Sequence, residues 1–196
     1  MYWINKIVYM YIFKRFFSVI FVLFLFIQCS DNNTYLVEKG RVGLLHTETK
    51  IGDLKQIFSK DSLVSVLNSE KDATLFSNES DEYIVYSKEG EKLLEISPQI
   101  QADSLSRVRS IQIFDVNYKT DKGVSLKSTF KDINENYLVN KVETTLTSAT
   151  LFIDELNATI AIDKKELGLN SFSREQISID QIPDIAKIKY FTIWFN

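Results

Sequence analysis

The fold of this chain is decided by residues 107–118, which read RVRSIQIFDVNY. Ile111 and Ile113 alternate there with Ser110 and Gln112. A period of two places successive side chains on opposite faces of a strand, so we expect a long strand in a sheet with one buried face. Residues 188–195, IKYFTIWF, form a similar segment near the end of the sequence. The two segments predict two long strands.

These segments belong to a longer internal repeat. Residues 49–58 align with residues 128–137, so that Asp53 and Asp132 lie 79 residues apart. Residues 73–76 recur at 149–152 and residues 83–86 match 159–162, both at an offset of 76, and Ile111 matches Ile188 at an offset of 77. Four matches in order, at nearly constant offset, predict a tandem duplication with copies at about residues 40–118 and 119–196.

Each copy is expected to open with a short helix. Thr49 and Ser128 are typical N-cap residues, whose side-chain oxygens accept hydrogen bonds from amides of the first turn. Asp53 and Asp132 would then lie near the positive end of the helix dipole. Apolar residues recur at helical spacing in both copies, at Ile51, Leu54, Phe58 and at Phe130, Ile133, Tyr137.

Hairpins are expected after each helix. Residues 82–87 and 92–97 flank the turn sequence KEGE, and residues 149–153 and 158–163 flank DELN. The predicted fold class is therefore α+β: two tandem repeats, each a short helix followed by antiparallel strands, which form an antiparallel sheet with the helices packed on one face.

The glycine and helix that open each copy, residues 43–58 and 123–137, resemble the repeat layout of the β-lactamase inhibitor protein and of BamE-type outer-membrane lipoproteins. Those proteins are non-enzymatic binders. The resemblance implies that this domain binds a partner and does not catalyse a reaction.

The N-terminal region is typical of a signal peptide. Residues 16–27 read FFSVIFVLFLFI, with Lys14 and Arg15 before them and Cys29 soon after. The apolar run is shorter than the about 20 residues of a membrane span, although an uncleaved anchor is an alternative. Translation is expected to start at Met1 or at Met10. We expect a signal peptide at 1–28, a tether at 29–34 and one globular domain at 35–196.

Cys29 is the single cysteine, so it is free, intermolecular or modified. Its position at the end of the apolar run resembles the lipobox of bacterial lipoproteins of the Bacteroidetes type, in which this thiol is lipidated. The resemblance implies a domain tethered to a membrane of the bacterial cell envelope, on the outer membrane or the periplasmic face.

Composition makes nucleic acid an unsuitable partner. Cleavage before Cys29 would leave 168 residues with 20 basic and 26 acidic side chains. That acidic balance lacks the basic patch that a phosphate backbone requires.

Motifs for catalysis or cofactor binding are missing, so we expect no catalytic, metal or cofactor residues. His46 is the single histidine, whereas zinc sites need several His or Cys ligands. Ser128 and Lys131 have the S-x-x-K spacing without its companion motifs, and we interpret Ser128 as a helix cap. Glu79, Asp81 and Glu82 are interpreted as a solvated acidic loop.

Residues 118–123, YKTDKG, join the two copies. Tyr118, Lys119 and Thr120 place aromatic, cationic and hydroxyl groups in what we expect to be an exposed turn, either a plain linker or a partner contact. The leading hypothesis is a non-catalytic lipoprotein that binds an envelope protein or another envelope component. The alternatives are a carrier of a small or lipidic ligand, which needs an enclosed apolar pocket, and a carboxylate-based hydrolase, which needs two facing acids.

Overall fold

The computed structural model describes residues 34–66, 81–170 and 175–195. The signal-peptide segment, Cys29 and the repeat match at residues 73–76 lie outside these ranges. Within them, no helix has both the length and the apolar character needed to cross a membrane.

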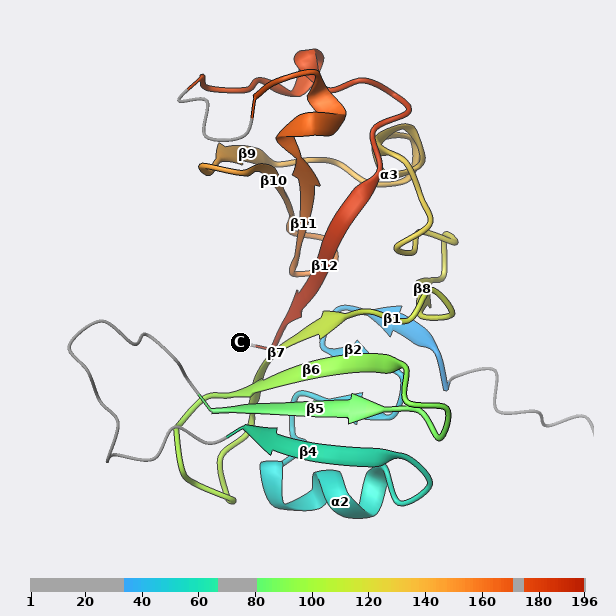
Figure 1. The fold of residues 1–196 in the computed structure, drawn as a ribbon, viewed down its shortest axis with the longest axis vertical. Coiled ribbons are helices and arrows are strands. Elements are labelled where there is room, and N and C mark those ends of the chain that lie inside the picture. Colours follow the sequence, from blue (N-terminus) through green and yellow to red (C-terminus); the bar gives the residue numbers. More distant parts are fainter. Residues whose placement is uncertain (1–33, 67–80, 171–174, 196) are drawn as a thin grey trace, which may run out of the picture. The chain divides into compact units, whose positions relative to one another are not determined.

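The main element is an antiparallel sheet of eight strands in the order β4-β5-β6-β7-β12-β11-β10-β9 (Figure 1). β7 and β12 pair at its centre, so β4 and β9 form its two edges. The strands are β4 (Ser62–Val66), β5 (Glu82–Tyr86), β6 (Lys92–Pro98), β7 (Val108–Ile113), β9 (Lys141–Thr144), β10 (Ser148–Ile153), β11 (Ala158–Asp163) and β12 (Ile188–Trp194).

The two predicted hairpins are confirmed. β5 pairs with β6 across the turn that contains Gly90, and β10 pairs with β11 across residues 154–157. The strand expected over 107–118 ends earlier, at Ile113, and the β12 strand ends at Trp194. Both edge strands, β4 and β9, were missing from the prediction. They are short, and their pattern of exposed and half-buried residues is weak.

Helical turns open both halves of the sheet at equivalent positions. In the first half they are η1 (Ile51–Asp53) and α2 (Leu54–Ile57), and in the second half α3 (Phe130–Asn136). The amide of Ile51 donates to the carbonyl of Ser106 at 2.9 Å, and the amide of Phe130 donates to the carbonyl of Ala186 at 2.8 Å. Each helical segment therefore starts against the loop that leads into the last strand of its half.

Isolated bridges give the correspondence between the two last strands. Lys50 bridges Arg107, and Thr129 bridges Lys187. Arg107 and Lys187 thus hold equivalent positions 80 residues apart, which makes Phe191 the counterpart of Ile111. The sequence alignment that matched Ile111 with Ile188 was wrong by three residues, because both segments are apolar enough to align in more than one register.

A second sequence match was also wrong. Residues 83–86 belong to β5, the second strand of its half, whereas residues 159–162 belong to β11, the third strand of the other half. Two core strands with similar apolar alternation were aligned although they occupy different places in the sheet.

The expected N-caps were one residue early. Thr129 is the N-cap of α3, where it forms a capping box with Asp132, and Lys50 precedes η1 without a side-chain cap. The hydroxyls of Thr49 and Ser128 instead accept hydrogen bonds from the amides of His46 and Ser125, at 2.9 and 3.1 Å. These two hydroxyls stabilise the turn before the helical segment.

A second, four-stranded sheet was not predicted. Its order is β3-β2-β1-β8, and β1 pairs with β8 in parallel. The strands are β1 (Leu36–Glu38), β2 (Arg41–Val42), β3 (Leu45–His46) and β8 (Lys119–Thr120). Gly43 lies in the β2–β3 turn with φ +57°, and a Cβ there would approach the Thr34 carbonyl oxygen too closely, so the turn requires glycine.

The core lies on one face of the eight-stranded sheet. One row of directly paired residues on this face crosses all eight strands and is entirely apolar, and the six central ones are buried. We call it the inner row: Leu63, Val85, Leu94, Ile113, Phe191, Ile160, Leu151 and Val142. Leu54 of α2 and Ile133 of α3 are buried in the same apolar cluster. Two short 3-10 helices, η3 (Lys164–Leu167) and η4 (Ile179–Gln181), complete the described elements.

Candidate functional site: the outer face of the sheet

The opposite face of the sheet carries a second row of paired residues. We call it the outer row: Val64, Ile84, Glu95, Gln112, Thr192, Thr159, Phe152 and Lys141. Each of these residues is half-buried or exposed. Side chains alternate along a strand, so the outer row points away from the apolar core.

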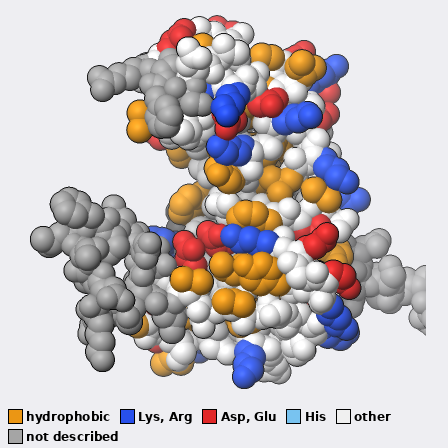
Figure 2. Space-filling model, viewed as in Figure 1, with side chains coloured by type: hydrophobic (Ala, Val, Ile, Leu, Met, Phe, Trp, Pro, Cys, Tyr) orange, Lys and Arg blue, Asp and Glu red, His pale blue; other side chains and the backbone are white. Residues whose placement is uncertain are grey.

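The composition of the outer row changes along the sheet. Aliphatic residues lie at the β4 end, and polar residues occupy the centre. Figure 2 shows apolar side chains next to Lys and acidic side chains on the face seen over β4–β6. This mixed composition is compatible with a non-obligate protein interface, which is about as apolar as the rest of a protein surface.

Lys92 and Glu95 form a charged group on β6, next to the central β7–β12 pair. The ammonium of Lys92 lies 2.5 Å from a carboxylate oxygen of Glu95 and 3.9 Å from the ring centroid of Phe114. The ammonium of Lys92 therefore contacts both the carboxylate of Glu95 and the ring of Phe114 on this face.

Trp194 provides an aromatic surface at the β12 end. Its indole N–H donates to the hydroxyl of Thr159 at 3.1 Å, and its backbone carbonyl accepts from the side-chain amide of Asn157 at 2.8 Å. The indole, Thr159, Asn157 and Phe152 all line a hollow of about 350 Å³. Asp154 and Thr150 also line it, but apolar groups provide most of its surface.

A second hollow, of about 510 Å³, lies between the helical turn and the β4 edge. Its lining combines charged, hydroxyl and apolar side chains: Lys55, Phe58, Ser59, Asp61, Leu63, Ser65 and Tyr83. Burial raises the pKa of the Tyr83 phenol, and the nearby charge of Asp81 raises it further, so Tyr83 stays neutral in this hollow.

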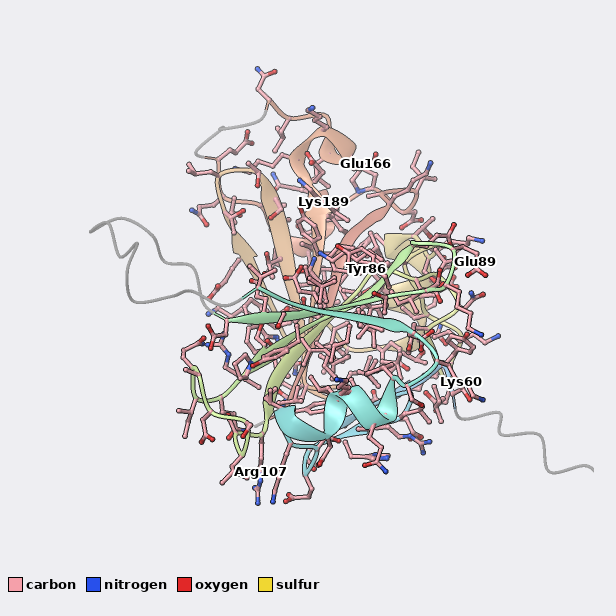
Figure 3. The ribbon with its side chains drawn as sticks, turned by 60° about the horizontal axis from the view of Figure 1, so that its bottom comes forward. Lys60, Tyr86, Glu89, Arg107, Glu166 and Lys189 are labelled. Atoms are coloured by element: carbon pink, nitrogen blue, oxygen red, sulfur yellow. The ribbon has the colours of Figure 1, made fainter. Side chains whose placement is uncertain are left out.

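Asp163 and Lys189 form an ion pair near the end of β11, with 2.8 Å between the ammonium and a carboxylate oxygen. Figure 3 labels Lys189 together with Glu166, which accepts a hydrogen bond from the amide of Lys187. The hydrogen bond from Lys189 holds the pKa of Asp163 below its ordinary value, and the same bond raises the pKa of Lys189. Asp163 is therefore ionised and does not serve as a proton donor near neutral pH.

The structure places the predicted partner-contact residues mostly inside the protein. Tyr118 and Thr120 are 4% and 3% exposed, and Lys119 alone lies at the surface. The Tyr118 ring packs edge-on against Tyr35, with 5.1 Å between the centroids, and burial raises the pKa of its phenol. The expectation of an exposed turn was wrong, because β8 pairs with β1 and draws these side chains into the core.

The acidic cluster was also misinterpreted. Asp81 is 3% exposed and accepts a hydrogen bond from the amide of Ala102, while Gln101 accepts one from the amide of Asp81. Asp81 therefore holds the β6–β7 loop, where Ala102 has φ +54°. Glu82 begins β5, and Glu79 lies outside the described residues.

The other candidate groups remain separate. His46 is exposed in β3, and Lys131 points to Glu135 at 3.7 Å while the Ser128 hydroxyl binds the preceding turn. The described part of the chain contains no group of three His, Cys, Asp or Glu side chains that could hold a metal ion.

Sequence reasoning did not identify the outer row as a candidate site. The signal was present in the hairpins, where Ile84 precedes the buried Val85 and Glu95 lies between the buried Leu94 and Ile96. Their pairing with residues of distant strands depends on the order of the strands in the sheet.

Comparisons with known proteins give information on the fold and none on the function. No family model and no curated protein matches the sequence. Among solved structures, the chain is similar to the uncharacterized protein yfeY from Escherichia coli, with a TM-score of 0.52 and 13% identity. The match covers 81% of this chain and 98% of that chain, so it includes most of both folds.

Proposed function

We propose that this protein is an envelope-tethered lipoprotein whose domain is a non-catalytic binding module, with the outer face of its sheet as the binding surface. The observation that carries the proposal is the outer row itself. It crosses eight strands, mixes half-buried apolar groups with polar ones, and faces away from the core.

The tether is proposed from the sequence, through Cys29. Metabolic labelling with a radiolabelled fatty acid tests it by comparing the wild type with Cys29→Ala. We expect label in the wild type and none in the variant. Label in neither protein would remove the lipoprotein proposal and leave a secreted or helix-anchored domain.

Binding through the outer face is tested by site-specific photo-crosslinking in cells. A photoreactive amino acid replaces Thr192, at the centre of the outer row, or Lys131, which is exposed on α3. We expect a discrete adduct from position 192 and none from position 131. Equal adducts from both positions would contradict a binding face on the sheet.

The larger hollow favours this proposal over a lipid carrier. Charged and hydroxyl side chains line it beside apolar ones, whereas a carrier of an acyl chain needs a predominantly apolar enclosure.

We further infer that the two halves arose by tandem duplication. The equivalent bridges and helix-entry hydrogen bonds support this inference, as does the strand order, which is mirrored about the β7–β12 pair. A duplicated half that pairs through its last strand would produce this arrangement.

A further inference from the structure

The two edges of the eight-stranded sheet differ in their chemistry. β9 carries Lys141 and Glu143, both exposed and ion-paired with each other. β4 reads SLVSV and has no charge, and Val64 and Val66 are 43% and 48% exposed. Charged side chains on an edge strand oppose edge-to-edge pairing, and uncharged β-branched residues favour it. β9 is thus protected, whereas β4 has the composition of a strand that accepts a neighbour.

The hollow of about 510 Å³ lies directly beside this edge. Leu63 and Ser65 of β4 line it together with Tyr83 of β5 and Phe58 at the end of α2. Figure 3 shows α2 at the front of the molecule beside β4, with Lys60 near the turn between them. A strand added alongside β4 would direct alternate side chains toward this hollow, as β4 itself does.

The sequence of β4 is complementary to its own edge. In an antiparallel pair centred on Val64, the two copies of Val64 face each other, and Leu63 of one copy lies opposite Ser65 of the other. Leu63 then lies at the open side of the second copy's hollow, across Ser65 from Tyr83. No like charges oppose each other, so this pair lacks the repulsion that destabilises cross-strand neighbours.

We propose that β4 is a dimerisation edge, through which two copies of this chain join their sheets in antiparallel fashion and each completes the other's hollow with Leu63. This inference goes beyond the proposed binding function, because it uses the β4 edge and not the outer face; it rests on the proposed function only for the lipid tether. A lipid tether would confine the copies to one membrane surface, so that even a short edge pair associates at the raised effective concentration.

Disulfide cross-linking in native membranes tests the pairing. Val64→Cys places a cysteine opposite its own copy, within the separation that a disulfide spans. We expect this variant to form a covalent dimer under mild oxidation. The matched control Glu143→Cys places a cysteine on the exposed β9 edge and is expected to stay monomeric.

A second variant keeps the test sharp. Ser65→Lys in the Val64→Cys background places a cation in the pair, and we expect about tenfold less cross-linked dimer. Circular dichroism of each variant checks that the domain is folded. Absence of the Val64→Cys dimer, an equal Glu143→Cys dimer or an unchanged yield with Ser65→Lys would each overturn the proposal.

The outcomes separate this inference from the lipoprotein proposal. The unmodified chain is the control for Cys29. A dimer formed by that chain would reveal a free Cys29 thiol and count against lipidation. Loss of the Val64→Cys dimer with fatty-acid labelling retained would overturn the dimer edge alone.

Discussion

The two halves of the sheet share a plan and differ in detail. In each half a helical segment packs on the inner row, three strands follow, and the last strand pairs at the centre. The buried positions correspond: Leu54 and Ile133 are both 0% exposed. The differences lie at the helix start, where only α3 has a capping box, and at the sheet edges, where only β9 is charged. The apolar residues buried at equivalent positions determine the fold of both halves. The helix starts and the sheet edges lie outside this core, so they can differ without changing the fold.

The largest effect is expected at the junction of the halves. Phe191 is fully buried in β12, which pairs with β7 on one side and β11 on the other. Phe191→Ala should lower the free energy of unfolding by about 3–5 kcal/mol, because it leaves a cavity at the centre of the inner row. Urea denaturation measures this, with Thr192→Ala on the outer face as the control. A loss below about 1 kcal/mol would show that the halves do not depend on this junction.

The two helical segments should contribute similarly to the core. Leu54→Ala and Ile133→Ala should each lower the free energy of unfolding by about 2–5 kcal/mol, since both side chains are fully buried in one cluster. The same urea experiment compares them. A large cost in one half and a negligible cost in the other would break the correspondence between the halves.

Because only α3 has a capping box, equivalent substitutions at the two helix starts should have different effects on stability. Asp132 accepts from the amide of Thr129 at 2.7 Å and from its hydroxyl at 3.0 Å. Asp132→Ala should therefore cost about 1 kcal/mol of stability. Asp53 makes no side-chain cap bond, and Asp53→Ala should cost only about a few tenths of a kcal/mol. Thermal unfolding of the two variants at neutral pH measures the difference, and equal costs would refute it.

The smallest effect concerns alkaline pH. Phe58 and Tyr137 end the helical segments at equivalent positions, but only Tyr137 titrates. Burial, together with the adjacent Asp121 carboxylate, raises the pKa of Tyr137 to about 12 from its ordinary value of 10.0. A raised folded-state pKa gives stability that is complete below the ordinary pKa and is lost as the pH rises through 12.

Tyr137→Phe should therefore reduce the loss of stability between about pH 9 and about pH 11, measured by urea unfolding at the two values. Part of the loss should persist, because burial also raises the pKa of Tyr118. An unchanged pH dependence in Tyr137→Phe would show that the phenol is not protected in the folded state.

The hairpins were predictable because their information is local. Alternation of apolar and polar residues, interrupted by a short turn sequence, fixes neighbouring strands and the face that they bury. The helical entry at residues 49–58 and 128–137 was predictable for the same reason, since apolar spacing and a nearby hydroxyl residue mark it. The exact caps were not, because the neighbours Ser128 and Thr129 both have suitable side chains and only the backbone geometry makes Thr129 the cap, while Ser128 stabilises the preceding turn.

The candidate site was less accessible to sequence reasoning. The outer row joins residues as distant as Val64 and Lys141, and the alignments failed where two apolar strands could be exchanged or shifted. The sequence by itself determined the two hairpins and the helical turns that open each half. The tertiary structure alone decided the β1–β8 pair that buries Tyr118, the register of β12 against β7, and the edge positions of β4 and β9. Those features depend on hydrogen bonds between distant segments, whose partners are selected by the packing of the whole core and not by any local pattern.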